Sequence, residues 1–335
     1  CDGEEEKTDA GKISQEGRDA GERAAFIRKR VWISMLKTQR MKDNSEIIPY
    51  QDPRLPLYVA TGKLSLFYNM TPLCHWHDEL EYIRPECGCM YYYINGEKII
   101  LKEGEAVLIN SRQMHYSSPY HQQDCTYQAV LFRTQLLTGS REIVRKYICP
   151  ITQNPSFSYI RLYASQPGHQ KIMDLFQRIC QNYRKNIKEK ELYVISDLLR
   201  MWAALYELQN AAERDSQTED ENIRSQRNMM SYIYQNYRKK LSLQEIAEAG
   251  NVSRNKCCSL FKQFVNQTPL EFLNSYRLES SIPLLLDTSR SITEVALSSG
   301  YQGSSYYAEI FRRYKDLSPS EYRKKNRGLS VNTDF

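Results

Sequence analysis

Short apolar runs separated by turn residues fill the region between residues 47 and 133, and this pattern predicts a series of β-strands. Asn95-Gly96 stands between two of these runs and is a strong signal for a two-residue hairpin, and the polar stretch 102–105 predicts a second turn. Regular short strands with such turns are typical of a small barrel or sandwich. We expect strands at residues 63–68, 81–83, 90–94, 98–101, 106–109 and 127–132.

Apolar positions recur every three to four residues between 168 and 209, which predicts two consecutive amphipathic helices. Such helices form an antiparallel hairpin, whose remaining apolar surface can either pair with a second copy of the chain or simply cover the barrel. We favour pairing, and therefore a homodimer. The two apolar stripes are Ile172, Leu175, Phe176, Ile179 and Tyr183, and then Leu192, Ile195, Leu198, Leu199, Trp202, Leu205 and Tyr206.

The composition is that of an ordinary globular protein, with 41% apolar and 26% charged residues among 335. These values exclude wholesale disorder, collagen-like repeats and a disulfide scaffold. No run approaches the roughly 18 consecutive apolar residues of a membrane helix, so we expect no membrane partner. The length predicts about two domains.

Cysteine usage and the first residues indicate a cytoplasmic protein with a polar leader. The nine cysteines are an odd number without zinc-finger spacing, which favours reduced thiols. Residues 1–30 are polar and charged without periodicity, so we expect a disordered leader. A lipid-anchored Cys1 on a polar tether is an alternative. We favour a gene-start artefact, with Met35 or Met41 as the native start.

The net charge of +6 is concentrated in one part of the chain. Residues 227–327 hold 16 lysines and arginines against 9 acidic residues, a balance of +7, and the remaining residues hold 30 against 31, a balance of −1. A basic domain indicates a polyanionic partner. The acid-rich polar stretch 211–226 before it is typical of an interdomain linker.

Four helix-start signals form an internal repeat in this basic part. Each is a Ser or Thr followed three residues later by Glu, the capping-box pattern that satisfies the free amides of a new helix. The first and third signals lie 49 residues apart and the second and fourth lie 50 apart, so one unit occurs twice with a one-residue insertion. The signals are Ser242…Glu245, Thr268…Glu271, Ser291…Glu294 and Ser318…Glu321.

Each repeat predicts a helix-turn-helix. A short helix, 243–249 or 292–299, meets a turn in which we expect Gly250 or Gly300 to end the helix with a positive φ angle, and a second helix follows. One face of that second helix is apolar and must point to the core. The core-facing residues are Cys257, Leu260, Phe261 and Phe264 in the first repeat, and Tyr307, Ile310, Phe311 and Tyr314 in the second.

The opposite faces of the two second helices carry short polar side chains and cations. Such groups reach base edges and phosphates, although any solvated helix face is also polar. Two such faces in register within the basic part of the chain favour double-stranded DNA as the partner. The DNA-binding candidates are Arg254, Asn255, Lys256, Cys258, Ser259, Lys262, Ser304, Ser305, Ala308, Glu309, Arg312 and Arg313.

The stretch ITEVALSSGYQGSSYYAEIFRRYKDLSPSEYR at residues 292–323 resembles the signature of AraC-type (AraC/XylS-like) transcription regulators, and so does the weaker first copy. The resemblance implies two helix-turn-helix units joined by a long helix, here 269–286, which enter successive major-groove segments on one face of DNA. It also implies a small-molecule effector, and RNA polymerase as a partner of an activator. Pro283 departs from the pattern because an interior proline removes a backbone bond and can kink the helix. Glu309 departs from it as an acid on a reading face, able to accept from cytosine but not to bind phosphate.

Two stretches in the N-terminal region resemble the motifs of cupin barrels: His75-Trp-His77-Asp-Glu-Leu-Glu81 with Gly88, and Gly104-Glu105 with Asn110 to His115. In metal-bearing cupins the matching positions hold one divalent ion. His75 and His77 alternate on one strand and should face the interior, and three imidazoles with a carboxylate suit iron, nickel, zinc or manganese. AraC-type sensor domains commonly hold an organic effector instead, so no cofactor is firmly expected. The effector pocket candidates are His75, His77, Glu81, His115, Tyr91 and Tyr93, of which the first four are also the metal candidates.

We therefore expect a multidomain α+β chain with a cupin-like barrel and an all-α tandem helix-turn-helix domain. It should act as a sequence-specific DNA-binding transcription regulator without enzymatic activity or catalytic residues. The alternative is a metal-dependent cupin enzyme that carries a DNA-binding domain. The expected parts are a disordered leader 1–45, an effector-binding barrel 46–165, a dimerising hairpin 166–210, a linker 211–226, a DNA-binding domain 227–327 and a tail 328–335.

Overall fold

The computed structural model describes residues 39–40, 45–137, 140–154, 157–185, 188–211, 221–286 and 289–326. The chain divides into two compact bodies, of which the larger is Gln39–Arg277 and the smaller contains Leu278 and the described residues after it. Apart from residues 39–40 and 45, the expected leader lies outside the described residues, as does the expected tail. Each body is described by itself.

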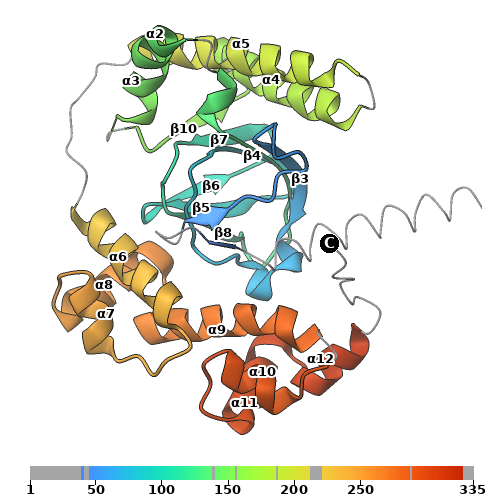
Figure 1. Cartoon of the computed structure of the whole chain (residues 1–335). Helices are drawn as coiled ribbons and strands as arrows, with labels where there is room; N and C mark the ends of the chain where they lie inside the picture. The colour runs from blue at the N-terminus through green and yellow to red at the C-terminus, as the bar shows by residue number, and fades with distance from the viewer. Residues whose placement is uncertain are drawn as a thin grey trace, which may run out of the picture. The chain divides into compact units, whose positions relative to one another are not determined.

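Two antiparallel sheets form the barrel of the larger body (Figure 1). The five-stranded sheet has the order β10-β7-β4-β9-β3, and the three-stranded sheet has the order β6-β5-β8. A separate pair, β1 (Gln39–Arg40) and β2 (Glu46–Ile47), precedes them. The barrel strands are β3 (Leu57–Lys63), β4 (Leu80–Cys87), β5 (Met90–Ile94), β6 (Glu97–Leu101), β7 (Glu105–Ile109), β8 (His115–Pro119), β9 (Thr126–Phe132) and β10 (Tyr159–Tyr163).

Five of the six strands expected from the sequence are confirmed, and the one at 63–68 is wrong. Strand β3 ends at Lys63, where the expected strand begins, and two short turns, η1 (Leu64–Leu66) and η2 (Tyr68–Met70), follow it. The Leu64 amide donates to the Cys125 carbonyl at 3.0 Å, and the Ser65 amide donates to the Asp124 side chain at 3.0 Å. These bonds direct the backbone away from the hydrogen-bond ladder of the sheet. The alternation of apolar residues that predicted a strand nevertheless continues in the sequence.

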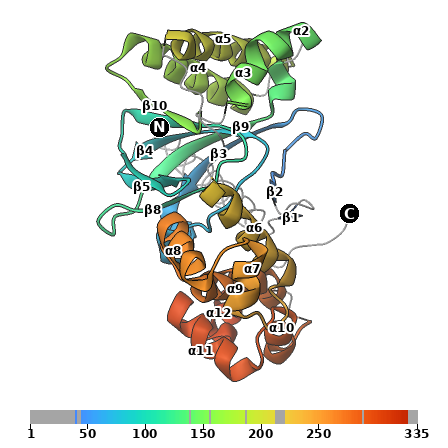
Figure 2. The ribbon, with the colours of Figure 1, turned by 90° about the vertical axis from the view of Figure 1, so that its left-hand side faces the viewer.

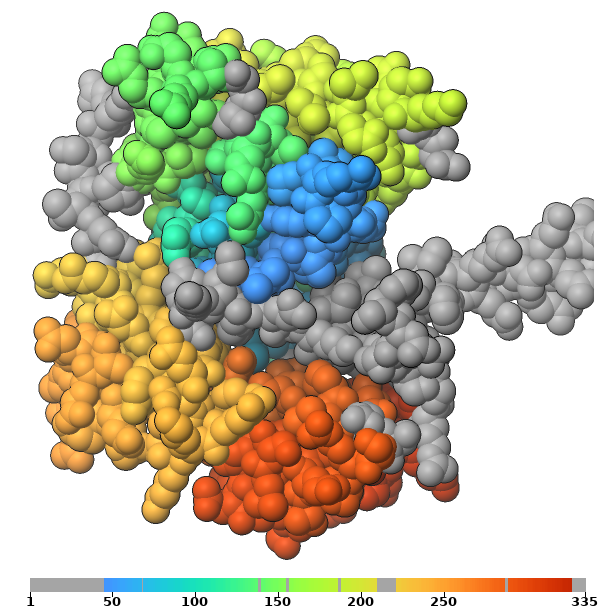
Figure 3. Space-filling view, viewed as in Figure 1, coloured from blue at the N-terminus to red at the C-terminus, as the bar shows by residue number. Residues whose placement is uncertain are grey.

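Helices α4 (Pro167–Arg184) and α5 (Lys190–Ala211) pack as a hairpin over the five-stranded sheet (Figures 1 and 2). Their yellow-green atoms form a layer over the strands in the space-filling view (Figure 3). The stacked rings of Tyr82 and Phe176, whose centroids lie 3.9 Å apart, join β4 to α4. Between β9 and β10 the chain forms η3 (Thr134–Leu137), α2 (Arg141–Ile143), η4 (Val144–Ile148) and α3 (Cys149–Thr152).

The expected apolar stripe of α5 divides between two environments. Leu198, Trp202 and Leu205 are buried against the barrel, whereas Leu192 and Leu199 are exposed. Trp202 also donates its indole N–H to the Tyr147 carbonyl at 3.0 Å. The hairpin therefore covers the sheet and still presents apolar surface to solvent.

The first helix-turn-helix belongs to the larger body and follows helix α6 (Glu221–Asn236). It comprises α7 (Leu243–Ala249) and α8 (Arg254–Val265). Helix α6 includes the last six residues of the expected linker, 221–226, because its first turns also pack: Gln226 is buried and Ile223 contacts the core. The rest of the expected linker, 212–220, lies outside the described residues.

Helix α9 (Pro269–Leu286) contributes to the cores of both bodies and continues through Pro283. The smaller body adds α10 (Ile292–Ser298), α11 (Ser304–Lys315) and α12 (Pro319–Lys325). The expected core faces are confirmed, since all eight residues are buried except Tyr314, which is half-buried. No described helix is long and apolar enough to cross a membrane.

All four capping boxes expected from the sequence are confirmed. The Ser or Thr side chain accepts a hydrogen bond from the Glu amide three residues on, and the Glu carboxylate accepts one from the Ser or Thr amide. Because these bonds join residues three apart, the local sequence is enough to predict them.

The expected role of glycine in the two turns is correct only in the second. Gly300 has a φ angle of +84°, but Gly250 has −86° and Asn251 takes the left-handed position with 53°. Gly250 is required by close packing instead, because a Cβ atom there would lie 2.5 Å from Met229 Cγ. The Val252 amide donates to the Ala247 carbonyl, and the equivalent Tyr301 amide donates to the Ala296 carbonyl. Up to this turn, equivalent positions of the two repeats are therefore 49 residues apart.

Candidate functional site

The DNA-binding candidates of the first helix-turn-helix all lie on α8. Its side chains Arg254, Asn255, Lys256, Ser259 and Lys262 are exposed and Cys258 is half-buried. The helix starts at Ser253, whose hydroxyl accepts from the Lys256 amide at 3.2 Å. With its apolar face held in the core, α8 presents three cations and two small polar groups to solvent.

Helix α11 presents the corresponding face of the second helix-turn-helix. Ser305, Glu309, Arg312 and Arg313 are exposed, and Ser304 and Ala308 are half-buried. Arg313 donates to Glu309 at 2.8 Å, one helical turn away. Glu309 therefore offsets the charge of Arg313, and the face of α11 is less basic than that of α8.

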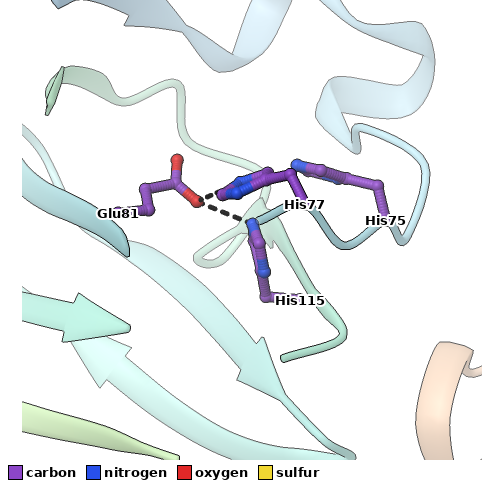
Figure 4. A group of neighbouring side chains, drawn as sticks. All are labelled: His75, His77, Glu81 and His115. Carbon is purple, nitrogen blue, oxygen red and sulfur yellow. Dashed lines mark ion pairs between the residues drawn. The ribbon is translucent and has the colours of Figure 1, made fainter. Parts of the chain in front are cut away.

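The barrel brings together three histidines and one glutamate from two separate stretches of the sequence (Figure 4). His75, His77, Glu81 and His115 each offer a ligand atom, and these atoms lie within 4.8 Å of one another. Glu81 lies on β4, and His115 begins β8. His75 and His77 are not on a strand, contrary to expectation: His75 forms only an isolated bridge with His115, although both imidazoles still reach the cluster.

Backbone carbonyl oxygens orient all three imidazoles in the same way. His75 Nδ1 lies 2.8 Å from the Leu73 oxygen, His77 Nδ1 lies 3.2 Å from that of Glu79, and His115 Nδ1 lies 2.8 Å from that of Gln113. A carbonyl oxygen only accepts, so each Nδ1 carries the hydrogen. In a neutral ring Nε2 is then a free ligand, which is the usual arrangement around metal-bound histidines.

Two of the Nε2 atoms face the same oxygen of Glu81. His115 Nε2 lies 2.6 Å and His77 Nε2 lies 3.5 Å from Glu81 Oε2, and these three buried atoms have no hydrogen-bond partner. The Nε2 lone pair of His115 and the carboxylate oxygen of Glu81 repel each other at this distance. A positive charge between them removes the repulsion, and either a proton or a metal ion can supply it. Three imidazoles and one carboxylate suit iron, nickel, zinc or manganese.

Burial and mutual contact set the charges of the cluster. Burial lowers the pKa of His75 to about 4, so this ring is neutral near pH 7. Burial alone would raise the pKa of Glu81, but the adjacent His115 and His77 hold it well below its usual range. The site therefore pairs an ionised carboxylate with at least one neutral imidazole ligand.

Tyr92, rather than Tyr91 or Tyr93, lies beside the cluster. Its ring is buried and stacks toward His115 with centroids 6.2 Å apart. Tyr93 stacks on Tyr116, and Tyr91 lies under the Lys98 ammonium at 3.5 Å, on the other face of β5. The alternation of Met90, Tyr92 and Ile94 on the buried side was the sequence signal for this.

A second carboxylate near the cluster was missed in the sequence. Glu46 on β2 lies with its Oε2 atom 3.8 Å from His75 Nε2, and its amide donates to the Trp76 carbonyl at 2.8 Å. It precedes the cupin-like motif by some thirty residues and belongs to no recognisable pattern. Only the fold brings it to the site.

Comparison with known proteins identifies both parts of the chain. A family model described as an AraC-like ligand binding domain matches residues 68–212, and one described as a helix-turn-helix domain matches residues 246–325. An uncharacterised HTH-type transcriptional regulator, YdeC, of Bacillus subtilis strain 168 is 30% identical over 84% of this chain and 96% of its own length. The melibiose operon regulatory protein of Escherichia coli K12 is 23% identical over 81% and 90%.

Among solved structures, unsaturated fatty acid bound wild-type ToxT from Vibrio cholerae strain SCE256 matches 85% of this chain and 100% of its own, with 12% identity and a TM-score of 0.45. The extended match to the B. subtilis regulator, the two family models and the repeated helix-turn-helix agree with one another. The chain belongs to the AraC-type family of transcription regulators.

Proposed function

We propose that this chain binds specific DNA sequences through α8 and α11 and changes its binding or its effect on transcription when a small molecule occupies the barrel. The carrying observation is the pair of equivalent helices, one in each repeat, that bury matching apolar faces and expose polar and basic ones. Side chains such as Asn255 and Arg312 are of the types that read base edges in the major groove.

Selection of bound sequences from a random DNA pool, followed by variants, tests this reading. Asn255→Ala or Arg312→Ala should weaken binding to the selected sequence by about 1–3 kcal/mol and relax the preference at one position. Lys262→Ala should weaken binding to all sequences alike, as loss of a phosphate contact does. Arg145→Ala, an exposed cation beside α2, serves as the control. Equal effects of Asn255→Ala on selected and scrambled DNA would contradict base reading.

We further propose a homodimer formed through α5. Leu192 and Leu199 are 71% and 45% exposed and lie on one face of the helix together with Ser196 and Ala203, which are exposed as well. These positions follow the spacing of a helix–helix seam. An apolar stripe on a helix whose opposite face is already buried supports pairing with a second copy.

We propose that the barrel senses its ligand and does not catalyse. The matched relatives of comparable length are regulators, which supports this assignment. The histidine cluster is the one observation that favours the alternative, a metal-dependent cupin enzyme with an attached DNA-binding domain. Metal analysis with turnover assays on wild-type protein and His77→Ala separates the two: turnover lost in the variant would support the enzyme.

The remaining partners follow from the proposed role. If the protein activates transcription, RNA polymerase is its further partner. A regulator must reach DNA, and we therefore place it in the cytoplasm.

A further inference from the structure

The segments that carry the histidines have two faces. His75 and His77 point to the cluster, and Trp76 between them points the other way and is 2% exposed. Its ring centroid lies 6.0 Å from that of Tyr234 on α6, and the Tyr234 hydroxyl donates to the Cys74 carbonyl at 2.9 Å. Both segments belong to the same compact body. One side of this stretch therefore faces the barrel site, and the other faces the first helix-turn-helix.

The third histidine repeats this arrangement. His115 faces the cluster, whereas its neighbours Met114 and Tyr116 are buried on the opposite side. These two residues share one hydrophobic cluster with Trp76 and with residues of α6, α7 and α8. The members from the DNA-binding part include Met229, Met230, Ile233, Tyr234, Ile246, Leu260 and Phe264.

Contacts from the turns of the barrel reach the same helices. Gly96, in the β5–β6 turn, packs so closely on α8 that a Cβ atom there would lie 3.3 Å from the Gln263 carbonyl oxygen and 3.5 Å from the Phe264 ring. Arg227 on α6 donates to the Arg112 carbonyl at 2.7 Å. The histidine-bearing segments and the reading helix α8 are thus connected through packed side chains.

We propose that the ligand sensed by the barrel is a divalent transition-metal ion held by His75, His77, Glu81 and His115, and that its binding is transmitted to α8 through Trp76 and Tyr234. This inference rests on the regulatory function proposed above and names both the ligand class and the route. Coordination brings four ligand atoms to about 2.0–2.2 Å from one centre. Two atoms at that distance from one centre lie no more than about 4.4 Å apart. The present atoms lie within 4.8 Å of one another, so coordination tightens the group and pulls on the segments that carry it.

Movement of these segments changes the side-chain packing against α6. Trp76 and Tyr116 are neighbours of the ligands along the backbone. A backbone shift at His75, His77 or His115 therefore also displaces the Trp76 and Tyr116 side chains that pack in the shared hydrophobic cluster. Close-packed interiors transmit such shifts since they contain few voids. Linkage then requires the effect to be reciprocal: an ion that changes DNA affinity must itself be bound with an affinity that depends on DNA.

The test uses the full-length chain, with Mn²⁺, Fe²⁺, Ni²⁺ and Zn²⁺ added separately as the probes. We expect one ion per chain, lost in His77→Ala but retained in His121→Asn, which changes an exposed histidine outside the cluster. Trp76 should report the ion directly: the fluorescence change of the wild type should disappear in Trp76→Phe, although Trp32 and Trp202 remain. No bound ion, or an ion-induced signal that persists in Trp76→Phe, overturns the proposal.

The readout on DNA uses a fragment selected from a random pool. The ion should change wild-type affinity roughly 5- to 150-fold, the usual range of coupling between sites. Tyr234→Phe removes only the hydroxyl that bonds to Cys74, so it should keep ion affinity while reducing the coupling, whereas Tyr237→Phe, whose hydroxyl bonds to Arg238, should behave as wild type. Full coupling in Tyr234→Phe, or specific DNA binding that ignores the ion, contradicts the route. If Trp76 responds but no DNA sequence is preferred, the proposed function fails instead.

Discussion

Single residues in the turns show how far local sequence determines local backbone. The left-handed position of the second turn is filled by Gly300 and that of the first by Asn251, both residue types that tolerate positive φ angles. The positive φ angle was predicted at Gly250 because glycine is the stronger signal for it. Glycine is required at this position instead because a side chain would collide with Met229 and the Ser225 carbonyl. Packing of this kind depends on a neighbouring helix and cannot be deduced from the turn itself.

Gly250→Ala tests this difference between conformation and space. The added methyl group would lie 2.5 Å from Met229 Cγ and 3.1 Å from the Ser225 oxygen, so we expect a loss of stability of about 1–3 kcal/mol, as for overpacked cores. Gly303→Ala is the matched control, because nothing lies within 4 Å of its Cβ position and its φ angle of −179° suits any residue. Chemical denaturation measures both. An equal loss in the two variants would show that backbone freedom, not space, matters at Gly250.

The candidate site could be predicted only in part at the scale of residues. His75, His77, Glu81 and His115 were found because their spacing matches a known motif. Tyr92 was missed in favour of Tyr91 and Tyr93, although its alternation with the apolar Met90 and Ile94 marks the buried face of β5. Glu46 was missed because its approach to His75 depends on a pairing of distant segments.

At the scale of elements, helix starts are the best-predicted features of this chain. Capping bonds join residues three apart, so the Ser–Glu pairs at α7, α10 and α12 were sufficient to place these helices. The start of α6 was missed because its first turns, 221–226, are polar in sequence and become part of a core only through packing. Local bonds are visible in sequence, whereas tertiary burial of polar stretches is not.

Removal of a cap should cost a defined amount. Ser318→Ala deprives the Glu321 amide of its acceptor at the start of α12, and we expect the smaller body to lose about 0.5–2 kcal/mol of stability. Ser320→Ala, at an exposed position in the same helix, is the control and should cost less than about 0.5 kcal/mol. The midpoint of urea denaturation provides the measurement. A larger loss at Ser320 than at Ser318 would refute the capping role.

The same caps predict a dependence of stability on pH. Hydrogen bonds from Ser291 and Ser318 lower the pKa of Glu294 and Glu321 below the ordinary value of 4.5, since the bonds favour the ionised form. This stabilisation is complete above pH 4.5 and is lost as the pH falls through the lower folded-state values. Glu294→Gln with Glu321→Gln should therefore flatten the loss of thermal stability below pH 4.5. An unchanged slope in the double variant would contradict this assignment.

Helix α5 carries the prediction about oligomeric state. Leu199→Glu places a charge on the exposed apolar stripe, and we expect the proposed dimer to dissociate without unfolding, because Leu199 is not part of the barrel core. Leu270→Glu, an equally exposed leucine on α9, should leave the dimer intact. Sedimentation equilibrium at several concentrations distinguishes the two states. A wild-type chain that stays monomeric throughout would end the dimer proposal.

At the scale of the whole molecule, the repeat and the charge distribution predicted the division of labour between the two parts. The excess of +7 in residues 227–327 coincides with the exposed polar and basic faces of α8 and α11. What the sequence did not predict is that the first helix-turn-helix shares a hydrophobic cluster with barrel residues such as Trp76 and Met114. Those contacts join residues more than a hundred positions apart, and no local sequence pattern predicts them.

A fragment that begins at Glu221 should keep the DNA-reading function but lose its control. It retains α6 to α12 with all four capping boxes, so we expect the preference for the selected DNA sequence to persist. It lacks the barrel side chains that cover Tyr234, so its melting temperature should be lower than that of the same part in the full chain. A second fragment starting at Arg227 also loses Ile223 and Gln226 and should be less stable still. Fluorescence anisotropy with selected and scrambled DNA at two salt concentrations measures the outcome: if the longer fragment binds both DNAs equally and only at low salt, α8 and α11 do not read sequence.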